Sequence, residues 1–194
     1  MNHVLTSGPI WYLMRASGVV SLLLLTAVCT LGIATTTRVR AGSLPRFVTL
    51  GLHRSVSLLA VAFLTVHVLT AIADPDASVR AVSVLVPQWS DRYALWLGLG
   101  ALALDLVIAL VLTSLLRHRL SPRIWHAVHV LAYLAWPVAL LHGAGIGTDS
   151  SSAWMLTVDG ICIAAFGGAV ALRLLIAPSP ASKHLSPARA RAAR

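Results

Sequence analysis

Long apolar runs separated by short polar segments make up most of this chain. Five runs cover residues 10–35, 50–73, 93–116, 124–141 and 154–176. A helix needs about 20 mainly apolar residues to cross the roughly 30 Å hydrocarbon core of a bilayer. The pattern therefore predicts an all-α fold, an integral membrane helical bundle of about five transmembrane helices.

The two ends of the chain lack this pattern. Residues 1–9 form a short lead, and residues 177–194 are rich in Pro, Ser, Ala and basic side chains, so we expect this basic tail to be disordered. The first apolar run could also be a signal peptide, but cleavage near Ala34 would leave Arg38, Arg40 and Arg46 outside, against the charge rule. We therefore treat it as the first span of one membrane domain, residues 10–176.

Composition and charge agree with a membrane protein and set an orientation. The chain is 58% hydrophobic and 11% charged, with net charge +9, where soluble domains carry about 25% charged residues. The basic residues lie in short loops between apolar runs and do not form one stripe on a soluble face. Membrane topology therefore explains them better than nucleic-acid binding does. On one side lie Arg15, Arg80 and Arg92, and the twelve others lie on the opposite side. The positive-inside rule then places the amino terminus outside and the carboxyl terminus in the cytoplasm.

Four histidines occur at matched positions in the second and fourth apolar runs. His53 and His67 are fourteen residues apart, and His129 and His142 are thirteen apart, or roughly 21 and 19.5 Å along a helix. Because spans two and four run in the same direction, His53 and His129 share an inner depth. His67 and His142 share an outer depth.

Two imidazoles at one depth suit a particular kind of centre. A histidine within a membrane span is costly without a partner and commonly marks a functional site. Two neutral imidazoles make a six-coordinate haem centre that transfers electrons rather than binding oxygen. Zinc requires three or four ligands, which neither depth supplies. The remaining alternatives are histidines that only join helices, and a single haem with two histidines left free.

Helical phase agrees for one helix and not for the other. Fourteen residues bring His53 and His67 to one face, whereas thirteen leave His129 and His142 out of phase on an ideal helix. Pro137 lies between them, and a kink there can reset the angle of the outer half. His126 is the rival of His129, but its distance to His142 is roughly 3 Å longer than the separation on the partner helix.

Other polar residues in or near the spans suggest supporting roles. Arg54 and Arg123 lie at the inner depth, where they are candidate partners of haem propionates or simple topology signals. Arg15, at the outer depth, can pair with an outer propionate or with Asp159. Asp105 lies near the middle of span three, where we expect a hydrogen bond across helices in preference to a proton or quinone path.

The two cysteines carry less information about function. Cys29 and Cys162 both fall inside apolar runs, without the spacing of a covalent haem or zinc motif. We expect both to be small buried hydrophobic side chains.

The segments LHRSVSLLAVAFLTVH and HVLAYLAWPVALLH, with the opening WYLMRASGVVSLLLL, resemble a known family. They are similar to the ferric reductase-like transmembrane domain of ferric reductases, NADPH oxidases and the haem-binding membrane subunit of the bacterial methionine sulfoxide reductase system. The resemblance implies two b-type haems, the inner held by His53 and His129 and the outer by His67 and His142. Many relatives have six spans, whereas five are expected here.

The resemblance implies a membrane electron-transfer subunit or haem-dependent oxidoreductase, and we expect it in a bacterial plasma membrane. No glycine-rich dinucleotide fingerprint occurs in the sequence. We therefore expect electrons to come from a separate cytoplasmic flavoprotein reductase or from quinol, and to reach an unidentified acceptor at the outer face. The alternative is a non-redox membrane protein, either a metal carrier using its histidines and Asp105 or a structural subunit.

Overall fold

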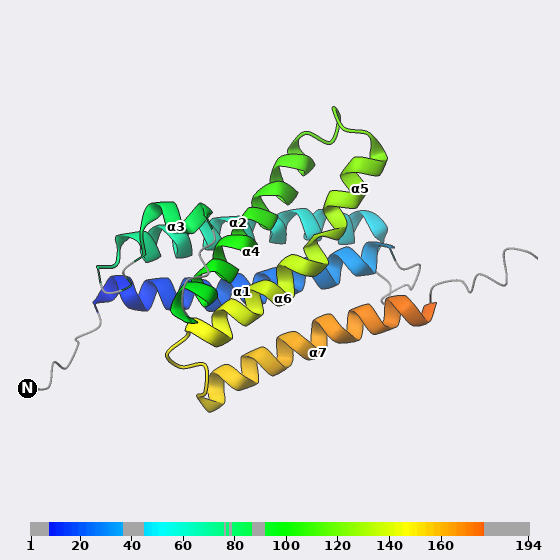
Figure 1. Cartoon of the computed structure of the whole chain (residues 1–194). Coiled ribbons are helices and arrows are strands. Elements are labelled where there is room, and N and C mark those ends of the chain that lie inside the picture. The colour runs from blue at the N-terminus through cyan, green and yellow to red at the C-terminus, as the bar shows by residue number, and fades with distance from the viewer. Residues whose placement is uncertain (1–7, 37–44, 76, 78, 87–91, 177–194) are drawn as a thin grey trace, which may run out of the picture.

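A computed structural model describes residues 8–36, 45–75, 77, 79–86 and 92–176. In these ranges the chain is helical and contains no strand (Figure 1). The helices are α1 (Pro9–Thr36), α2 (Arg46–Ala73), α3 (Ala81–Leu85), α4 (Arg92–Leu115), α5 (Pro122–Val130), α6 (Ala132–Ile146) and α7 (Ala153–Ile176). The tail at 177–194 and residues 1–7 of the lead lie outside the described residues.

Five helical segments are long and apolar enough to cross a membrane, which confirms the predicted all-α membrane bundle. They cover Pro9–Thr35, Phe47–Ala73, Tyr93–Leu115, Pro122–Ile146 and Ala153–Leu175. The fourth segment consists of α5 and α6 together, and it continues five residues beyond the predicted end at position 141.

The fourth span is interrupted at Leu131 and not at Pro137, where the sequence places the kink. Pro137 lies inside the continuous helix α6. Around Leu131 the backbone instead forms tighter i to i−3 hydrogen bonds. The Leu131 N–H donates to the Val128 carbonyl at 2.9 Å, and the Leu134 N–H donates to the Leu131 carbonyl at 2.9 Å. Such a short 3₁₀-like turn changes the helix axis and phase locally.

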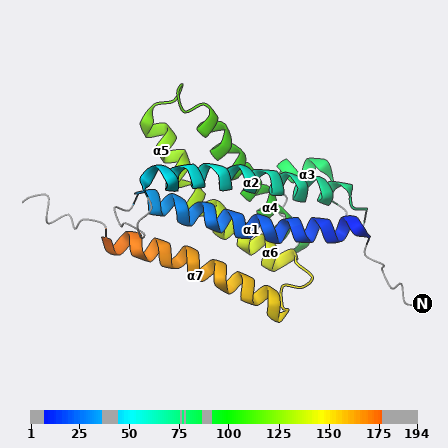
Figure 2. The ribbon, with the colours of Figure 1, turned by 180° about the vertical axis from the view of Figure 1, so that it is seen from behind.

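Four of the long helices pack as two pairs, and helix α7 lies on one side of them. Helix α2 packs along α1, and α4 packs along α6, while α7 lies against α1 on the side away from α2 (Figures 1 and 2). The buried core lies between α1, α6 and α7 and includes Leu22, Cys29, Trp136, Met155 and Cys162. Both cysteines are free and buried, as predicted.

Two polar contacts join α6 to its neighbours. The Trp136 indole N–H donates to the Thr26 hydroxyl at 2.8 Å within the buried core. Arg173 of α7 donates to the Tyr133 hydroxyl, and its guanidinium lies 5.4 Å from the centre of that ring. These contacts fix α6 against α1 and α7, so the face of α6 that carries His142 has a defined orientation.

Among residues 47–73 of α2, no side chain is buried. One side of α2 packs on α1. Another side faces α4, α5 and α6 but lies close to them at only a few positions. The arrangement leaves the histidines of α2 facing the histidines of the fourth span.

Candidate functional site

The four histidines form two facing pairs, in the combinations that the equal depths predict. The ring centres of His53 and His129 are 6.4 Å apart, and those of His67 and His142 are also 6.4 Å apart. We call His53 and His129 the inner pair and His67 and His142 the outer pair, after the predicted orientation. In each pair one ring comes from α2 and the other from α5 or α6.

Both rings of the outer pair are fixed by backbone carbonyls. The Nδ1 of His67 lies 2.8 Å from the Met14 carbonyl oxygen, and the Nδ1 of His142 lies 2.8 Å from the Trp96 carbonyl oxygen. Because a carbonyl oxygen only accepts, each Nδ1 carries the proton and donates it. The Nε2 of each ring is then the nitrogen with a free lone pair, as a metal-binding imidazole requires.

The inner pair is held differently. The Nδ1 of His53 lies 3.1 Å from the Val28 carbonyl oxygen. The Nδ1 of His129 is buried and has no hydrogen-bond partner in the described part of the chain. Instead, His129 stacks on Trp125, with ring centres 4.6 Å apart and an interplanar angle of 19°. An aromatic contact thus replaces the backbone acceptor at this one ring.

Three glycines provide the room that these rings occupy. A Cβ atom at Gly100 would lie 2.6 Å from the His142 ring, and one at Gly18 would lie 2.9 Å from the His67 ring. A Cβ atom at Gly32 would lie 3.3 Å from the His53 ring. Contacts below about 3 Å require a neighbour to move, so the rings of the outer pair depend most strongly on these glycines.

These glycines were not predicted from the sequence, although a signal was present. Gly18 and Gly32 are fourteen residues apart, the same spacing as His53 and His67. Since α1 and α2 are antiparallel neighbours, Gly18 faces His67 and Gly32 faces His53. Equal spacing of small residues on one helix and large residues on the next indicates that each glycine makes space for a ring.

The distances within each pair fit a metal ion held between two imidazoles. A metal–nitrogen bond to histidine is about 2.0–2.1 Å long. A five-membered ring with bonds of about 1.35 Å places each atom roughly 1.15 Å from its centre. A metal between two rings therefore requires about 6.3–6.5 Å between ring centres, which matches the 6.4 Å found in both pairs.

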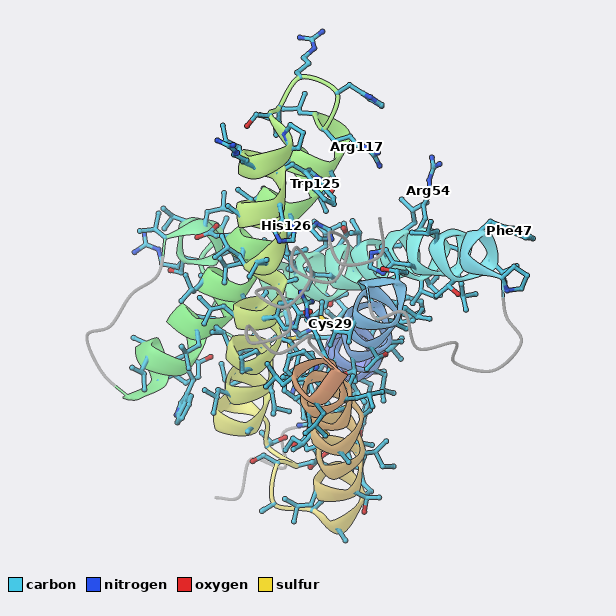
Figure 3. The ribbon with its side chains drawn as sticks, turned by 90° about the vertical axis from the view of Figure 1, so that its right-hand side faces the viewer. Cys29, Phe47, Arg54, Arg117, Trp125 and His126 are labelled. Atoms are coloured by element: carbon cyan, nitrogen blue, oxygen red, sulfur yellow. The ribbon has the colours of Figure 1, made fainter. Side chains whose placement is uncertain are left out.

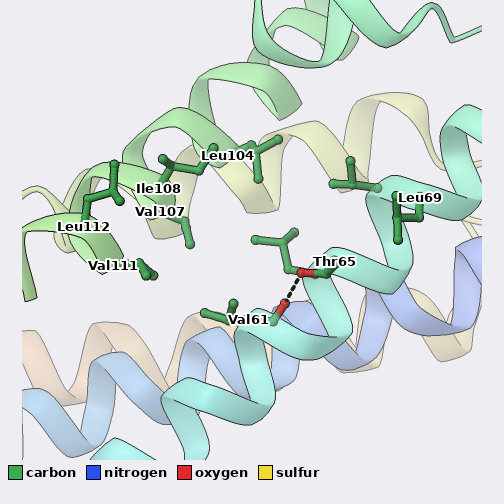
Figure 4. Close-up of a pocket in the computed structure, with 10 residues that line it drawn as sticks. Val61, Thr65, Leu69, Leu104, Val107, Ile108, Val111 and Leu112 are labelled. Atoms are coloured by element: carbon green, nitrogen blue, oxygen red, sulfur yellow. Dashed lines mark hydrogen bonds between the residues drawn. The ribbon is translucent and has the colours of Figure 1, made fainter. Parts of the chain in front are cut away.

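The helices around the two pairs are mainly apolar, and each pair offers two imidazoles. No group of three or more histidine, cysteine or acidic side chains that could hold a metal ion occurs among the described residues. An apolar hollow of about 270 Å³ separates α2 from α4 (Figure 4), and its lining includes Leu64, Val68, Leu104, Val107 and Val111. The lining consists of aliphatic side chains and Thr65, and Val68 of this lining directly follows His67 in the sequence.

The candidate residues outside the two pairs have different surroundings. His126 is exposed, whereas His129, its rival, faces His53. Arg54 and Arg123 are exposed and form no ion pair with any described residue, and Figure 3 shows Arg54 projecting away from α2. The structure therefore brings His129 into a pair but leaves the two arginines at the surface.

Arg15 pairs with a different acid from the one predicted. Its guanidinium lies 2.5 Å from the Asp149 carboxylate, in the loop before α7, and 4.5 Å from the centre of the Trp11 ring. The predicted alternative of a pair with Asp159 is wrong, because Asp149 lies closer to the start of α1 on the same side of the bundle. Arg15 directly follows Met14, the acceptor for His67, in α1.

The two acids inside the spans lack the expected partners among the described residues. Asp105 is half-buried in α4 and makes no hydrogen bond with the described residues, so the hydrogen bond predicted across helices is not found there. Asp159 is 8% exposed in α7, and its Oδ1 has no described donor.

Comparison with known proteins gives one match. The family described as ferric reductase like transmembrane component has a sequence model that matches residues 17–140, more than half of the chain. These residues contain Gly18, Gly32, His53, His67 and His129, while His142 lies two positions beyond the match. No curated protein and no solved structure matches the chain.

Proposed function

Since the chain belongs to the ferric reductase-like transmembrane component family, we propose that it is a b-type cytochrome with two haems that moves electrons across a membrane. Family membership supports a general role in membrane electron transfer. The two-haem arrangement and the direction of transfer are the finer parts of this proposal.

The observation that carries the proposal is the pair of equal ring separations. The inner and outer pairs each have ring centres 6.4 Å apart, a separation at which two imidazoles could bind one metal ion. In this proposal His53 and His129 hold one haem iron, and His67 and His142 hold the other. When bound, haem with two imidazole ligands supplies one-electron redox chemistry without an open position for oxygen.

The side chains and backbone of this protein hold and orient those ligands. The carbonyls of Met14, Val28 and Trp96 keep the proton on Nδ1, which leaves Nε2 free to bind a metal and raises its basicity. The apolar side chains of the spans that carry the pairs would surround a bound group with a medium of low dielectric constant. We propose Arg54 and Arg123 as the cations available to propionates at the inner end, and Arg15 at the outer end.

We further propose a direction for the electrons. The excess of basic residues in the loops before α2, between α4 and α5 and after α7 supports a cytoplasmic location for that end. Electrons then enter near the inner pair from a separate flavoprotein reductase or from quinol, and leave near the outer pair to an acceptor outside. A bacterial plasma membrane is the proposed location.

The first test is a spectrum followed by a transport measurement. The purified full-length chain, expressed with ample haem, is expected to show a low-spin b-type reduced-minus-oxidised spectrum. In proteoliposomes that enclose ferricyanide, reductant added outside should reduce the enclosed ferricyanide. His142→Ala should abolish this transfer, while the matched variant His126→Ala, which changes an exposed histidine, should retain it.

A colourless protein would overturn the proposal and favour the non-redox alternative, a metal carrier or a structural subunit. A coloured protein that reduces no enclosed ferricyanide would contradict transmembrane transfer alone.

A further inference from the structure

A hollow with one arginine in a mainly apolar lining lies at the end of the bundle where α4 turns into α5. It has a volume of about 280 Å³ and is lined by Arg117, Leu120, Pro122 and Trp125. Figure 3 shows Arg117 and Trp125 at this tip, away from the α1 and α2 pair. The hollow is separate from the gap that contains the two histidine pairs, although Trp125 contributes to both regions.

The charges around this hollow favour an anion. Arg117, Arg119 and Arg123 are all exposed within seven residues of one another. Of the described acids, Asp74, Asp149 and Asp159 lie at or near the opposite end of the bundle, at the end of α2 and the start of α7, and Asp105 lies near the middle of α4. Basic side chains at one end of a membrane bundle attract anionic lipid headgroups.

Trp125 adds a hydrogen-bond donor that the described chain does not use. Its Nε1 is buried and has no described acceptor, and an indole N–H normally finds a partner when buried. A phosphate oxygen is an acceptor that an indole N–H and a guanidinium can share, and arginine binds phosphate through paired hydrogen bonds.

Apolar side chains next to the hollow distinguish a lipid from a free anion. Leu115 is 73% exposed, Leu116 is 48% exposed and Ile124 is 54% exposed, all within a few residues of Arg117 or Trp125. Exposed aliphatic side chains beside a basic hollow provide a surface for acyl chains. A free phosphate ion would gain nothing from them.

We propose that this hollow binds the phosphate of an anionic membrane phospholipid, with Arg117 and Trp125 as donors and the adjacent aliphatic side chains against the acyl chains. Trp125 also stacks on His129. A bound headgroup would therefore fix the Trp125 ring. This ring supports His129, which has no backbone acceptor among the described residues. The lipid site itself does not depend on the proposed electron transfer.

The test is native mass spectrometry of the full-length chain with defined lipids. Phosphatidylglycerol should be retained more strongly than phosphatidylcholine, and diacylglycerol, which lacks phosphate, should be retained least. Arg117→Gln should weaken retention of phosphatidylglycerol about fivefold, because it removes the charge-assisted hydrogen bond that Arg117 donates to the phosphate in this proposal. Trp125→Phe, which keeps an aromatic ring but removes the N–H, should also weaken it.

The matched control is Arg119→Gln, which removes the same charge from the same turn without changing a residue that lines the hollow. It should change retention less than twofold. Equal losses for Arg117→Gln and Arg119→Gln would overturn the site in favour of diffuse attraction. Equal retention of phosphatidylglycerol and diacylglycerol would also overturn it, leaving an acidic partner protein as the reason for the charge. Competition by inorganic phosphate at low millimolar concentration would show a free-anion site and contradict the lipid assignment.

Discussion

The outer and inner histidine pairs have the same ring separation but are held by different contacts. In the outer pair both Nδ1 atoms donate to backbone carbonyls, and glycines lie against both rings. In the inner pair only His53 has a carbonyl acceptor, and His129 rests on Trp125. A backbone acceptor inside a helix has a fixed position, whereas a side chain near the end of a span can respond to its surroundings. The outer pair should therefore be the more rigid site and the inner pair the more adjustable one.

The largest expected effect comes from filling the space beside the outer rings. Gly100→Ala adds a Cβ atom 2.6 Å from the His142 ring, and this ring cannot move without losing its bond to the Trp96 carbonyl. Overpacking of this kind costs about 1–3 kcal/mol, which predicts a loss of outer haem affinity of about 5- to 160-fold. Haem titration of the purified variant measures it.

Two controls separate this effect from a general loss of stability. Gly143→Ala lies next to His142 in the sequence but has open space around its Cβ position, so it should leave haem binding unchanged. Gly32→Ala, with a contact of 3.3 Å, should weaken the inner site less than Gly100→Ala weakens the outer site. If Gly143→Ala and Gly100→Ala behave alike, the proposed steric role is wrong.

An intermediate effect is expected from removing the stacking partner of the inner pair. Trp125→Ala removes an aromatic contact of about 0.5–1.5 kcal/mol, which corresponds to about 2- to 13-fold in affinity. The inner haem should bind more weakly while the outer haem is unchanged, as measured by haem titration monitored by absorbance. Trp154→Ala, at a tryptophan that is 50% exposed in α7, is the matched control. Equal weakening of both sites by Trp125→Ala would remove the distinction drawn between the pairs.

The smallest effect is expected from the ion pair near the outer site. Asp149→Asn removes the charged partner of Arg15, but the Asp149 side chain is 43% exposed, so the contribution to stability should be below about 1 kcal/mol. Thermal unfolding in detergent should show a small decrease, reduced further at high salt. A decrease as large as that of a buried core substitution would show that Arg15 supports the outer pair more directly.

Much of the fold and of the pairing could be predicted because the sequence repeats one simple signal. Apolar runs define the spans, and nearly equal separations bring His53 to His129 and His67 to His142. The break at Leu131 could not be predicted, because it arises from local i to i−3 hydrogen bonds that the residue types at these positions do not indicate. The kink was predicted at position 137 because a proline occurs there, but helix α6 continues through Pro137.

The contacts of individual side chains were harder to predict than the pairs. Choosing Asp149 over Asp159 for Arg15 depends on the path of the loop before α7, which the sequence does not specify. The carbonyl acceptors at Met14, Val28 and Trp96 are backbone atoms, so residue identity gives no sign of them. The glycines opposite the histidines did leave a signal in their spacing, which becomes clear once the antiparallel packing of α1 and α2 is known.

The most direct test of two independent histidine sites is haem content per chain in variants that each disrupt one pair. The account predicts about two haems in the wild type, about one in His53→Ala or His67→Ala, and none in the double variant, with a low-spin spectrum for each remaining haem. A wild type with about one haem, or single variants that both retain the wild-type content, would contradict the assignment of one haem to each pair.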